Sequence, residues 1–95
     1  MAKGYMIAHA TVTDQEKWGQ YLAKSKPVLE RFGGTPIVRG GRSEIVEGHG
    51  TQRNAVLEFP SYEAALDYAR SQEYADAKTL RAGAGTLDMT VVEGV

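Results

Sequence analysis

The residues of this sequence best suited to acid–base chemistry are His9 and Glu58. His9 belongs to a run in which Tyr5, Ile7, His9 and Thr11 alternate with small or apolar residues, a pattern typical of a β-strand. A histidine beside a carboxylate in a dry pocket can act as a general base near neutral pH, because the carboxylate stabilises the imidazolium and fixes the tautomer. We therefore predict His9 and Glu58 as catalytic residues. The alternative is a His9 that is only hydrogen-bonded within an interface.

Two arginines and one tyrosine are predicted to bind a substrate. Arg39 directly precedes two glycines, which let backbone come close, and a guanidinium offers a planar pair of donors to carboxylate or phosphate. Arg53 offers the same chemistry, and Tyr5 combines an apolar ring with a polar tip suited to lining a pocket. The alternatives are an ion pair of Arg39 with Glu47 or Glu58 that fixes the register of a dimer, and a Tyr5 that belongs to the core.

The spacing of histidines and glycines gives no support to a metal or cofactor site. His9 and His49 are the only histidines, and they are not spaced as a ligand pair on one helix face. The glycines around His49 lack the third glycine and the following helix of a phosphate-binding loop. A strand at 53–59 would carry a single aromatic ring, Phe59, and the formal charge is −1, so neither RNA nor an anionic membrane is an expected partner.

Composition and length indicate one domain over residues 1–95. A chain of 95 residues with 42% hydrophobic and 24% charged residues is too short for two cores. The absence of cysteine excludes disulfides, thiolate nucleophiles and cysteine-based zinc sites, and it favours the cytoplasm. The apolar stretch near the first residue is too short for a secretory segment, and no window approaches the roughly 18 apolar residues of a membrane span.

Hydrophobic periodicity predicts four strands and two helical regions. The predicted elements are a strand at 3–12, a helix at about 14–32, a strand at 35–39 with a further extended stretch at 42–47, a loop at 48–52, a strand at 53–59, helical pieces at 62–69 and 72–81, and a strand at 86–93. Thr13 and Glu16 have the spacing of a capping box, and Ser61 and Ser71 are predicted caps of the later helical pieces. Pro27 predicts a kink or a restart of the first helix.

This order, β-α-β-β-α-β, predicts a ferredoxin-like α+β fold: an antiparallel sheet with both helices on one face. We expect Met6, Ala8 and Ala10 to face the helices, because their small size permits close approach, and His9 to face the other way. The first and third strands are expected to be parallel neighbours, which would bring Glu58 into the same cavity as His9.

Adjacent apolar residues in the strands predict that both faces of the sheet are hydrophobic, because neighbours on a strand point to opposite faces. The pairs are Ile37-Val38, Ile45-Val46, Val56-Leu57 and Val91-Val92. The chain has helices enough for one face only. Each buried Val or Ile is worth roughly 1.5–3 kcal/mol, so leaving the second face in water would forfeit much of the stability. We therefore predict a homodimer through the open sheet face; the alternative is that these side chains lie half-wet at strand edges.

Several segments resemble domain of unknown function family 1330. They are Lys3-Gly4-Tyr5, Gly33 to Gly41, Glu47-Gly48, Arg53, Glu58-Phe59-Pro60-Ser61, Tyr74, Arg81 and Val91 to Val95. The resemblance covers nearly the whole chain and implies the dimeric α+β barrel fold, in which two ferredoxin-like subunits face each other through their sheets. It implies no reaction, because that fold's members include cofactor-free monooxygenases, haem-degrading enzymes and stress-responsive proteins.

Two functional hypotheses follow. The first is a homodimeric protein that binds a small, anionic organic molecule in a cleft between sheet and helices or at the subunit junction. It would carry out cofactor-independent acid–base or oxygenase-type chemistry, with His9 or Glu58 as the base and Arg39 stabilising the anion. The second is a non-enzymatic stress-response or ligand-sensing dimer. An enclosed cavity touching His9, Arg39 and Glu58 would favour the first hypothesis, and a filled interface with paired polar groups would favour the second.

Overall fold

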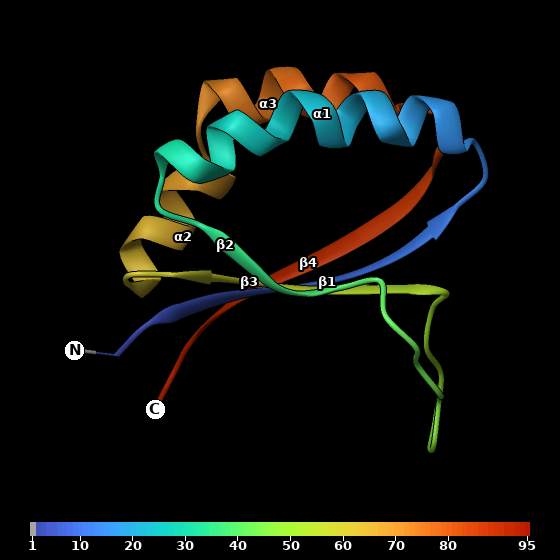
Figure 1. Ribbon diagram of the computed structural model, residues 1–95, viewed down its shortest axis with the longest axis horizontal. Coiled ribbons are helices and arrows are strands. Elements are labelled where there is room, and N and C mark those ends of the chain that lie inside the picture. Colours follow the sequence, from blue (N-terminus) through green and yellow to red (C-terminus); the bar gives the residue numbers. More distant parts are fainter. Residues whose placement is uncertain (1) are drawn as a thin grey trace.

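The computed structural model describes residues 2–95 as four strands with helices over one face of the sheet (Figure 1). The elements follow in the order β1 (Gly4–Val12), α1 (Gln15–Arg31), β2 (Thr35–Arg39), β3 (Arg53–Phe59), α2 (Tyr62–Ala69), α3 (Gln72–Lys78), the 3-10 turn η1 (Thr79–Arg81) and β4 (Gly85–Glu93). The predicted β-α-β-β-α-β order and the ferredoxin-like α+β fold are confirmed.

The sheet is antiparallel throughout, in the order β2-β3-β1-β4. β1 and β3 are neighbours, as predicted, but they run antiparallel and not parallel. The reason lies in the connections: the α1 crossover returns β2 parallel to β1, and the chain then reverses, so β3 opposes both. In this register Tyr5 lies opposite Glu58 and His9 lies opposite Asn54.

Short polar side chains begin the helices. Asp14 caps α1 by accepting a hydrogen bond from the backbone N–H of Lys17 at 3.1 Å, so the predicted capping box at Thr13 does not form. Ser61 and Ser71 cap α2 and α3 as predicted. α1 continues past Pro27 as one helix from Gln15 to Arg31, so the predicted restart does not occur.

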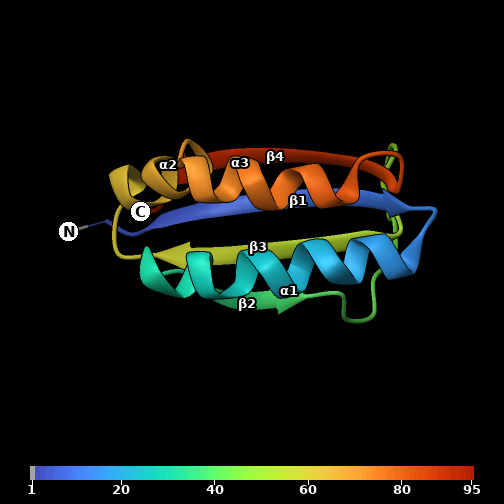
Figure 2. The ribbon, with the colours of Figure 1, turned by 90° about the horizontal axis from the view of Figure 1, so that it is seen from above.

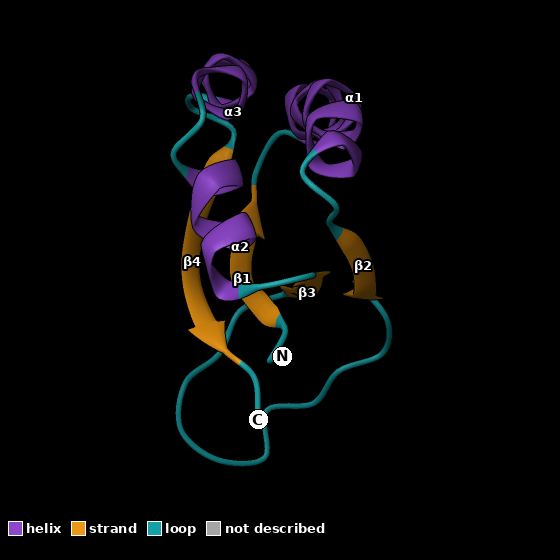
Figure 3. Cartoon of the chain, turned by 90° about the vertical axis from the view of Figure 1, so that its left-hand side faces the viewer, coloured by secondary structure: helices purple, strands orange, loops and turns teal. Residues whose placement is uncertain are grey.

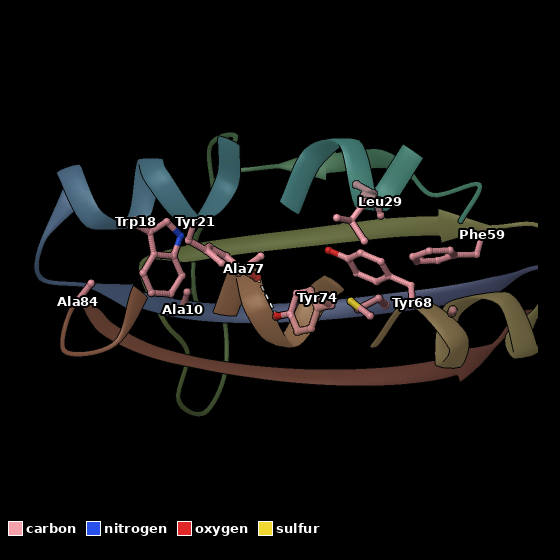
Figure 4. Close-up of a cluster of buried hydrophobic side chains, with 12 residues drawn as sticks. Ala10, Trp18, Tyr21, Leu29, Phe59, Tyr68, Tyr74, Ala77 and Ala84 are labelled. Atoms are coloured by element: carbon pink, nitrogen blue, oxygen red, sulfur yellow. Dashed lines mark hydrogen bonds between the residues drawn. The ribbon is translucent and has the colours of Figure 1, made fainter. Parts of the chain in front are cut away.

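A chain of aromatic side chains runs through the core between the sheet and the helices (Figure 4). Trp18 and Tyr21 of α1 meet edge to face with ring centroids 5.6 Å apart, and Tyr21 meets Tyr74 of α3 at 6.2 Å. Tyr68 of α2 continues the chain of rings, 5.0 Å from Tyr74 and 5.6 Å from Phe59 of β3. Such pairs contribute about 0.5–1.5 kcal/mol each beyond their buried area.

The sheet face away from the helices, here called the open face, is uncovered in this chain (Figure 3). Its side chains come from alternate positions that share a register across the strands: Tyr5, Ile7, His9 and Thr11 of β1, Asn54, Val56 and Glu58 of β3, Thr86, Asp88, Thr90 and Val92 of β4, and Val38 of β2. The predicted assignment of His9 to this face and of Met6, fully buried, to the helix side is confirmed.

The segment 40–52 forms a long loop that descends on the side of the open face (Figure 1). The predicted extended stretch at 42–47 is not a strand here. Ile45 and Val46 of this loop are 57% and 86% exposed. The loop therefore adds apolar side chains to the same side of the molecule as the open face.

Candidate functional site

A cleft of about 1220 Å³ lies between α1 and the helix-facing side of the sheet. α1 packs against α3 and η1 and contacts the strands little, while α2 packs on β1, β3 and β4. Seen from above, the helices follow two lines over the sheet, α1 above β2 and β3 and α2–α3 above β1 and β4 (Figure 2). The cleft is bordered by apolar and aromatic side chains that include Met6, Trp18, Tyr21, Leu29, Leu57, Tyr68 and Met89.

Small residues on the helix side of the strands leave room for this cleft. Ala8 and Ala10 of β1 and Ala55 of β3 all line it. The small size of Ala8 and Ala10 was expected to let a helix approach the sheet closely. Ala10 is buried in that manner, but Ala8 is only partly buried, because α1 does not descend onto it.

Arg39 and Arg53 both line the cleft. Arg39 lies opposite Ala55 of β3, and Arg53 lies two positions before Ala55 on the same strand, so both arginines project from the same face of the sheet. Diagonal neighbours of this kind are about 7–8 Å apart. A register shift between Pro36 and Val38 decides this orientation. The extra residue of the bulge turns Val38 to the open face and Arg39 to the cleft, whereas uninterrupted alternation from Pro36 would place them the other way round.

Neither cleft arginine forms an ion pair with a carboxylate of the described residues. The ion pairs among residues 2–95 are Lys3–Glu58 at 3.1 Å and Arg31–Glu73 at 2.8 Å. The alternative ion pair of Arg39 with Glu47 or Glu58 is therefore not formed inside one subunit. The two guanidinium groups retain donors for an anion.

Tyr5 and Glu58 form a hydrogen-bonded group on the open face. The Tyr5 hydroxyl donates to Glu58 Oε2 at 3.3 Å, and Lys3 Nζ donates to Glu58 Oε1 at 3.1 Å. The carboxylate of Glu58 raises the pKa of Lys3, through the hydrogen bond first and the opposite charge second. Both oxygens of Glu58 are thus engaged by donors, an arrangement that suits pairing more than proton abstraction.

His9 lies at the other end of the open face. Its Nδ1 lies 2.8 Å from the side-chain oxygen of Asn54, within hydrogen-bond distance. Asp88 of β4 is the register partner of His9 on its other side. Together with the loop 40–52, including His49, these residues line a second pocket of about 670 Å³.

The predicted site residues therefore divide into separate groups. His9 and Glu58 share a face, as expected, but four positions of β1 separate Tyr5, which pairs with Glu58, from His9, a distance of about 13 Å. Antiparallel pairing is the cause, because it sends Glu58, near the end of β3, to the start of β1. Arg39 and Arg53 project from the opposite face of the sheet, so His9, Arg39 and Glu58 do not line one cavity, the arrangement that would have favoured the enzymatic hypothesis.

Buried phenols give the cleft neutral hydrogen-bonding groups. The hydroxyls of Tyr21 and Tyr74 lie 2.8 Å apart in a hydrogen bond, and Tyr21 lines the cleft together with Tyr68. Burial raises the pKa of Tyr21 well above its ordinary value, the neighbouring Tyr74 adds to this, and Arg81 opposes it. Burial likewise raises the pKa of Tyr68 above its ordinary value, and the neighbouring Tyr74 raises it further. Tyr21 and Tyr68 therefore remain protonated at physiological pH.

Arg81 of η1 packs against two aromatic residues of α1, Trp18 and Tyr21. Its guanidinium carbon is 5.0 Å from the centre of the Tyr21 ring and 5.7 Å from that of Trp18. Within residues 2–95, Arg81 Nε is the buried side-chain polar atom that has no hydrogen-bond partner. Contact with two aromatic faces offsets part of the cost of burying this cation.

The cleft residues Trp18, Tyr21 and Tyr68 were not among the predicted binding residues. Their helical spacing of three and four marks them as core, and the core is where much of each ring lies. A signal that could have indicated a cleft is the run of small residues on the helix side of the strands.

Over the described residues 2–95, no group of three or more His, Cys, Asp or Glu side chains is placed to hold a metal ion. None of the described helices is both long enough and apolar enough to cross a membrane. The lining of the cleft also contains the polar side chains of Ser25, Lys26, Glu30, Gln52 and Asn54.

The sequence pattern of the family described as Domain of unknown function (DUF1330) matches residues 3–95. The chain belongs to the DUF1330 family. The family named by resemblance in the sequence analysis is thus confirmed. No curated protein matches this DUF1330 chain.

Solved structures share the fold of this DUF1330 protein at low sequence identity. A protein of unknown function from Rhodopseudomonas palustris has a TM-score of 0.79 at 19% identity, covering 99% of this chain and 83% of its own. SnoaB, a cofactor-independent oxygenase from Streptomyces nogalater, has a TM-score of 0.65 at 10% identity, covering 97% and 92%. A dimeric protein of unknown function with a ferredoxin-like fold from Bacteroides fragilis has a TM-score of 0.60 at 13% identity, covering 96% and 95%.

Proposed function

We propose that this DUF1330 protein is a homodimeric binding protein for a small organic anion with a flat apolar body, held in the cleft between α1 and the sheet. The observation that carries the proposal is the pair Arg39 and Arg53, free of carboxylate partners, on a cleft lined by aromatic and aliphatic side chains. Apolar walls with a small number of placed polar groups are the general pattern of small-molecule sites. Guanidinium groups select carboxylate or phosphate.

Binding is better supported than catalysis because the cleft lacks a suitably placed base. Tyr21 and Tyr68 are held protonated, and Glu30, the carboxylate that lines the cleft, is solvent-exposed. The predicted bases His9 and Glu58 lie on the other face of the sheet. A sensing or carrier role therefore fits the geometry better than proton abstraction.

A direct test uses 2-naphthoate, a bicyclic carboxylate, as the probe. Trp18, the sole tryptophan, lines the cleft, so its fluorescence reports binding. We expect Arg39→Gln and Arg53→Gln each to weaken binding about tenfold, since each removes charged donors. His9→Ala, the matched control, should leave the affinity unchanged. Equal binding of the neutral analogue 2-naphthalenemethanol, or no loss in either arginine variant, would refute the proposal.

Homodimer formation through the open face is the second part of the proposal. Val38 and Val92 on this face are 44% and 42% exposed, and the loop 40–52 adds Ile45 and Val46 on the same side. A second copy of the chain is the occupant we propose for this face, whose aliphatic side chains Ile7, Val38, Val56 and Val92 lie among polar ones. The dimeric relative of the same fold from Bacteroides fragilis supports this assembly.

Sedimentation tests the assembly directly. At micromolar concentration the mass should be about twice 10.3 kDa. Val56→Asp should yield monomer or unfolded chain, because it places an unpaired charge in the centre of the open face. A wild-type monomer, or a Val56→Asp dimer as tight as the wild type, would exclude this interface.

Cofactor-independent catalysis is the competing function, and the likeness in fold to SnoaB supports it. It would be recognised by conversion of an aromatic carboxylate that requires His9 or Glu58. Incubation of wild type, His9→Ala and Glu58→Gln with 2-naphthoate in air, followed by chromatography, tests for a product. We expect recovery of the unchanged probe in all three samples.

A further inference from the structure

We infer that Arg81 of η1 is a positioning residue of the cleft: its guanidinium group packs on the rings of Trp18 and Tyr21 and holds them as a wall against which an aromatic ring of the ligand lies. This inference rests on the proposed binding function. It adds to the site a residue outside the cleft lining, and it narrows the apolar body of the ligand to an aromatic one.

Arg81 carries a buried polar atom that the rest of the chain does not satisfy. Among the described residues, its Nε is the buried side-chain nitrogen or oxygen without a hydrogen-bond partner, and the two ion pairs of these residues involve other side chains. Burying an unpaired charged donor costs free energy, and contact with aromatic faces recovers part of it. The rings of Trp18 and Tyr21, 5.7 and 5.0 Å from the guanidinium carbon, are therefore the contacts that stabilise this cation where it lies.

Trp18 and Tyr21 belong both to this stack and to the cleft. The two residues line the cleft, whereas Arg81 is absent from the lining, so the guanidinium touches the rings from outside the cleft. Figure 4 shows the rings side by side under α1, near Ala10 of β1. They meet edge to face at 5.6 Å and are almost completely buried. In so closely packed a group, a shift of the guanidinium is passed on to the wall of the cleft.

The height of this wall above the sheet depends on the helical layer. α1 packs against α3 and η1 and contacts the strands little, so the strands below do not fix the position of Trp18 and Tyr21. Tyr74 of α3 holds the Tyr21 hydroxyl at 2.8 Å, and Arg81 of η1 contacts both rings. A wall that is fixed before binding lowers the entropy cost of holding a flat ligand.

An aromatic wall distinguishes between ligands of equal charge and similar size. A ligand ring packed edge to face or offset on Trp18 or Tyr21 gains about two- to tenfold in affinity over a saturated ring, as an aromatic pair provides. The gain depends on the angle and distance between the rings, so a wall that has shifted loses it. The preference for an aromatic ligand is therefore the property that Arg81 controls.

A matched pair of probes tests the inference by isothermal titration calorimetry. They are 2-naphthoate and trans-decahydro-2-naphthoate, which share the carboxylate and the bicyclic frame and differ in aromaticity. Both are titrated into wild type, Arg81→Gln and the control Arg70→Gln, which removes an exposed arginine at the end of α2, outside the cleft lining. We expect wild type and Arg70→Gln to bind 2-naphthoate about two- to tenfold more tightly than the saturated probe.

In Arg81→Gln the two affinities should become equal. Their ratio is insensitive to a general loss of electrostatic attraction or of folded protein, because either loss weakens both probes alike. A ratio that stays at the wild-type value in Arg81→Gln, one that falls as far in Arg70→Gln, or one that shows no aromatic preference in wild type overturns the inference and leaves the binding function intact. Failure of both probes to bind wild type, or binding that ignores Arg39→Gln, overturns the binding function itself.

Should Arg81→Gln not fold, Arg81→Lys is measured in its place. Lysine keeps the charge but lacks the planar face with which a guanidinium stacks on a ring. The aromatic preference should then fall by at least about half, and an unchanged preference in Arg81→Lys would refute the positioning role.

Discussion

Removal of either hydroxyl from the Tyr21–Tyr74 pair is expected to destabilise the protein by about 1–3 kcal/mol. The two oxygens are 2.8 Å apart, and the residues are 5% and 4% exposed. Both variants preserve the ring contacts; Tyr74→Phe leaves the Tyr21 hydroxyl without its partner, and Tyr21→Phe leaves the Tyr74 hydroxyl with the weak acceptor Met89 Sδ at 3.9 Å. The double variant removes both polar groups, so it should cost clearly less than the sum of the single variants, with a coupling of about 1–2 kcal/mol.

Urea denaturation followed by the fluorescence of Trp18 measures these free energies, because Trp18 is the sole tryptophan and is 4% exposed in the folded chain. All variants are compared at one protein concentration, since dimer formation would make stability depend on it. For a domain of this size, 1 kcal/mol corresponds to about 4–8 °C in Tm. Single variants that lose under 0.5 kcal/mol, or a double variant that equals the sum, would refute the description of the pair as a coupled buried hydrogen bond.

Three further predictions concern stability and can be measured by the same denaturation. Tyr21 and Tyr68 have raised pKa values, so above about pH 10 an unfolded chain releases phenolic protons that the folded chain retains. The free energy of unfolding should therefore be steady below that pH and fall by about 1.4 kcal/mol per pH unit per tyrosine above it. A flat profile would contradict the burial of these phenols. Gly85→Ala should cost at least about 2 kcal/mol, since its φ is +142° and a side chain would meet the carbonyl of Thr11; a neutral variant would disprove that contact. Gly19→Ala, in the middle of α1 with nothing within 4 Å, should instead stabilise by about 0.5–1 kcal/mol, and a loss would reveal an unseen contact, such as a partner subunit.

The order of elements could be predicted because it depends on local signals. Alternation in residues 4–12 and three-to-four spacing in residues 15–31 reflect the geometry of strand and helix themselves. Ser61 and Ser71 were recognisable as caps because capping involves groups within one helical turn. Asp14 was missed in favour of Thr13, since both residues can cap and the choice depends on the exact turn at which the chain leaves β1. The stretch 42–47 contains the β-branched pair Ile45-Val46, which favours a strand, but it pairs with no strand in the structure.

The sequence allowed individual candidate residues of the site to be chosen, but it did not allow their positions relative to one another to be predicted. The face of His9 followed from alternation along a single strand, whereas the distance from His9 to Glu58 depended on the direction of β3, which is a property of the connections. The orientation of Arg39 depended on the bulge at Ile37, and the tolerance of an edge strand for a bulge leaves no clear mark in the residues. The cleft required the position of α1 above the sheet, which follows from its packing on α3 and η1.

The bulge in β2 inserts one extra residue, Ile37, into this edge strand. Deleting Ile37 would restore regular pairing and leave Val38 and Arg39 on their present sides, so such a shortened chain should keep its ligand site. Pulling the strand straight at full length would exchange the two residues, moving a cation out of the ligand's reach and onto the surface where two subunits are proposed to meet. Because β2 is hydrogen-bonded along one edge only, a slip of this kind would disturb a single ladder of hydrogen bonds, the one between β2 and β3.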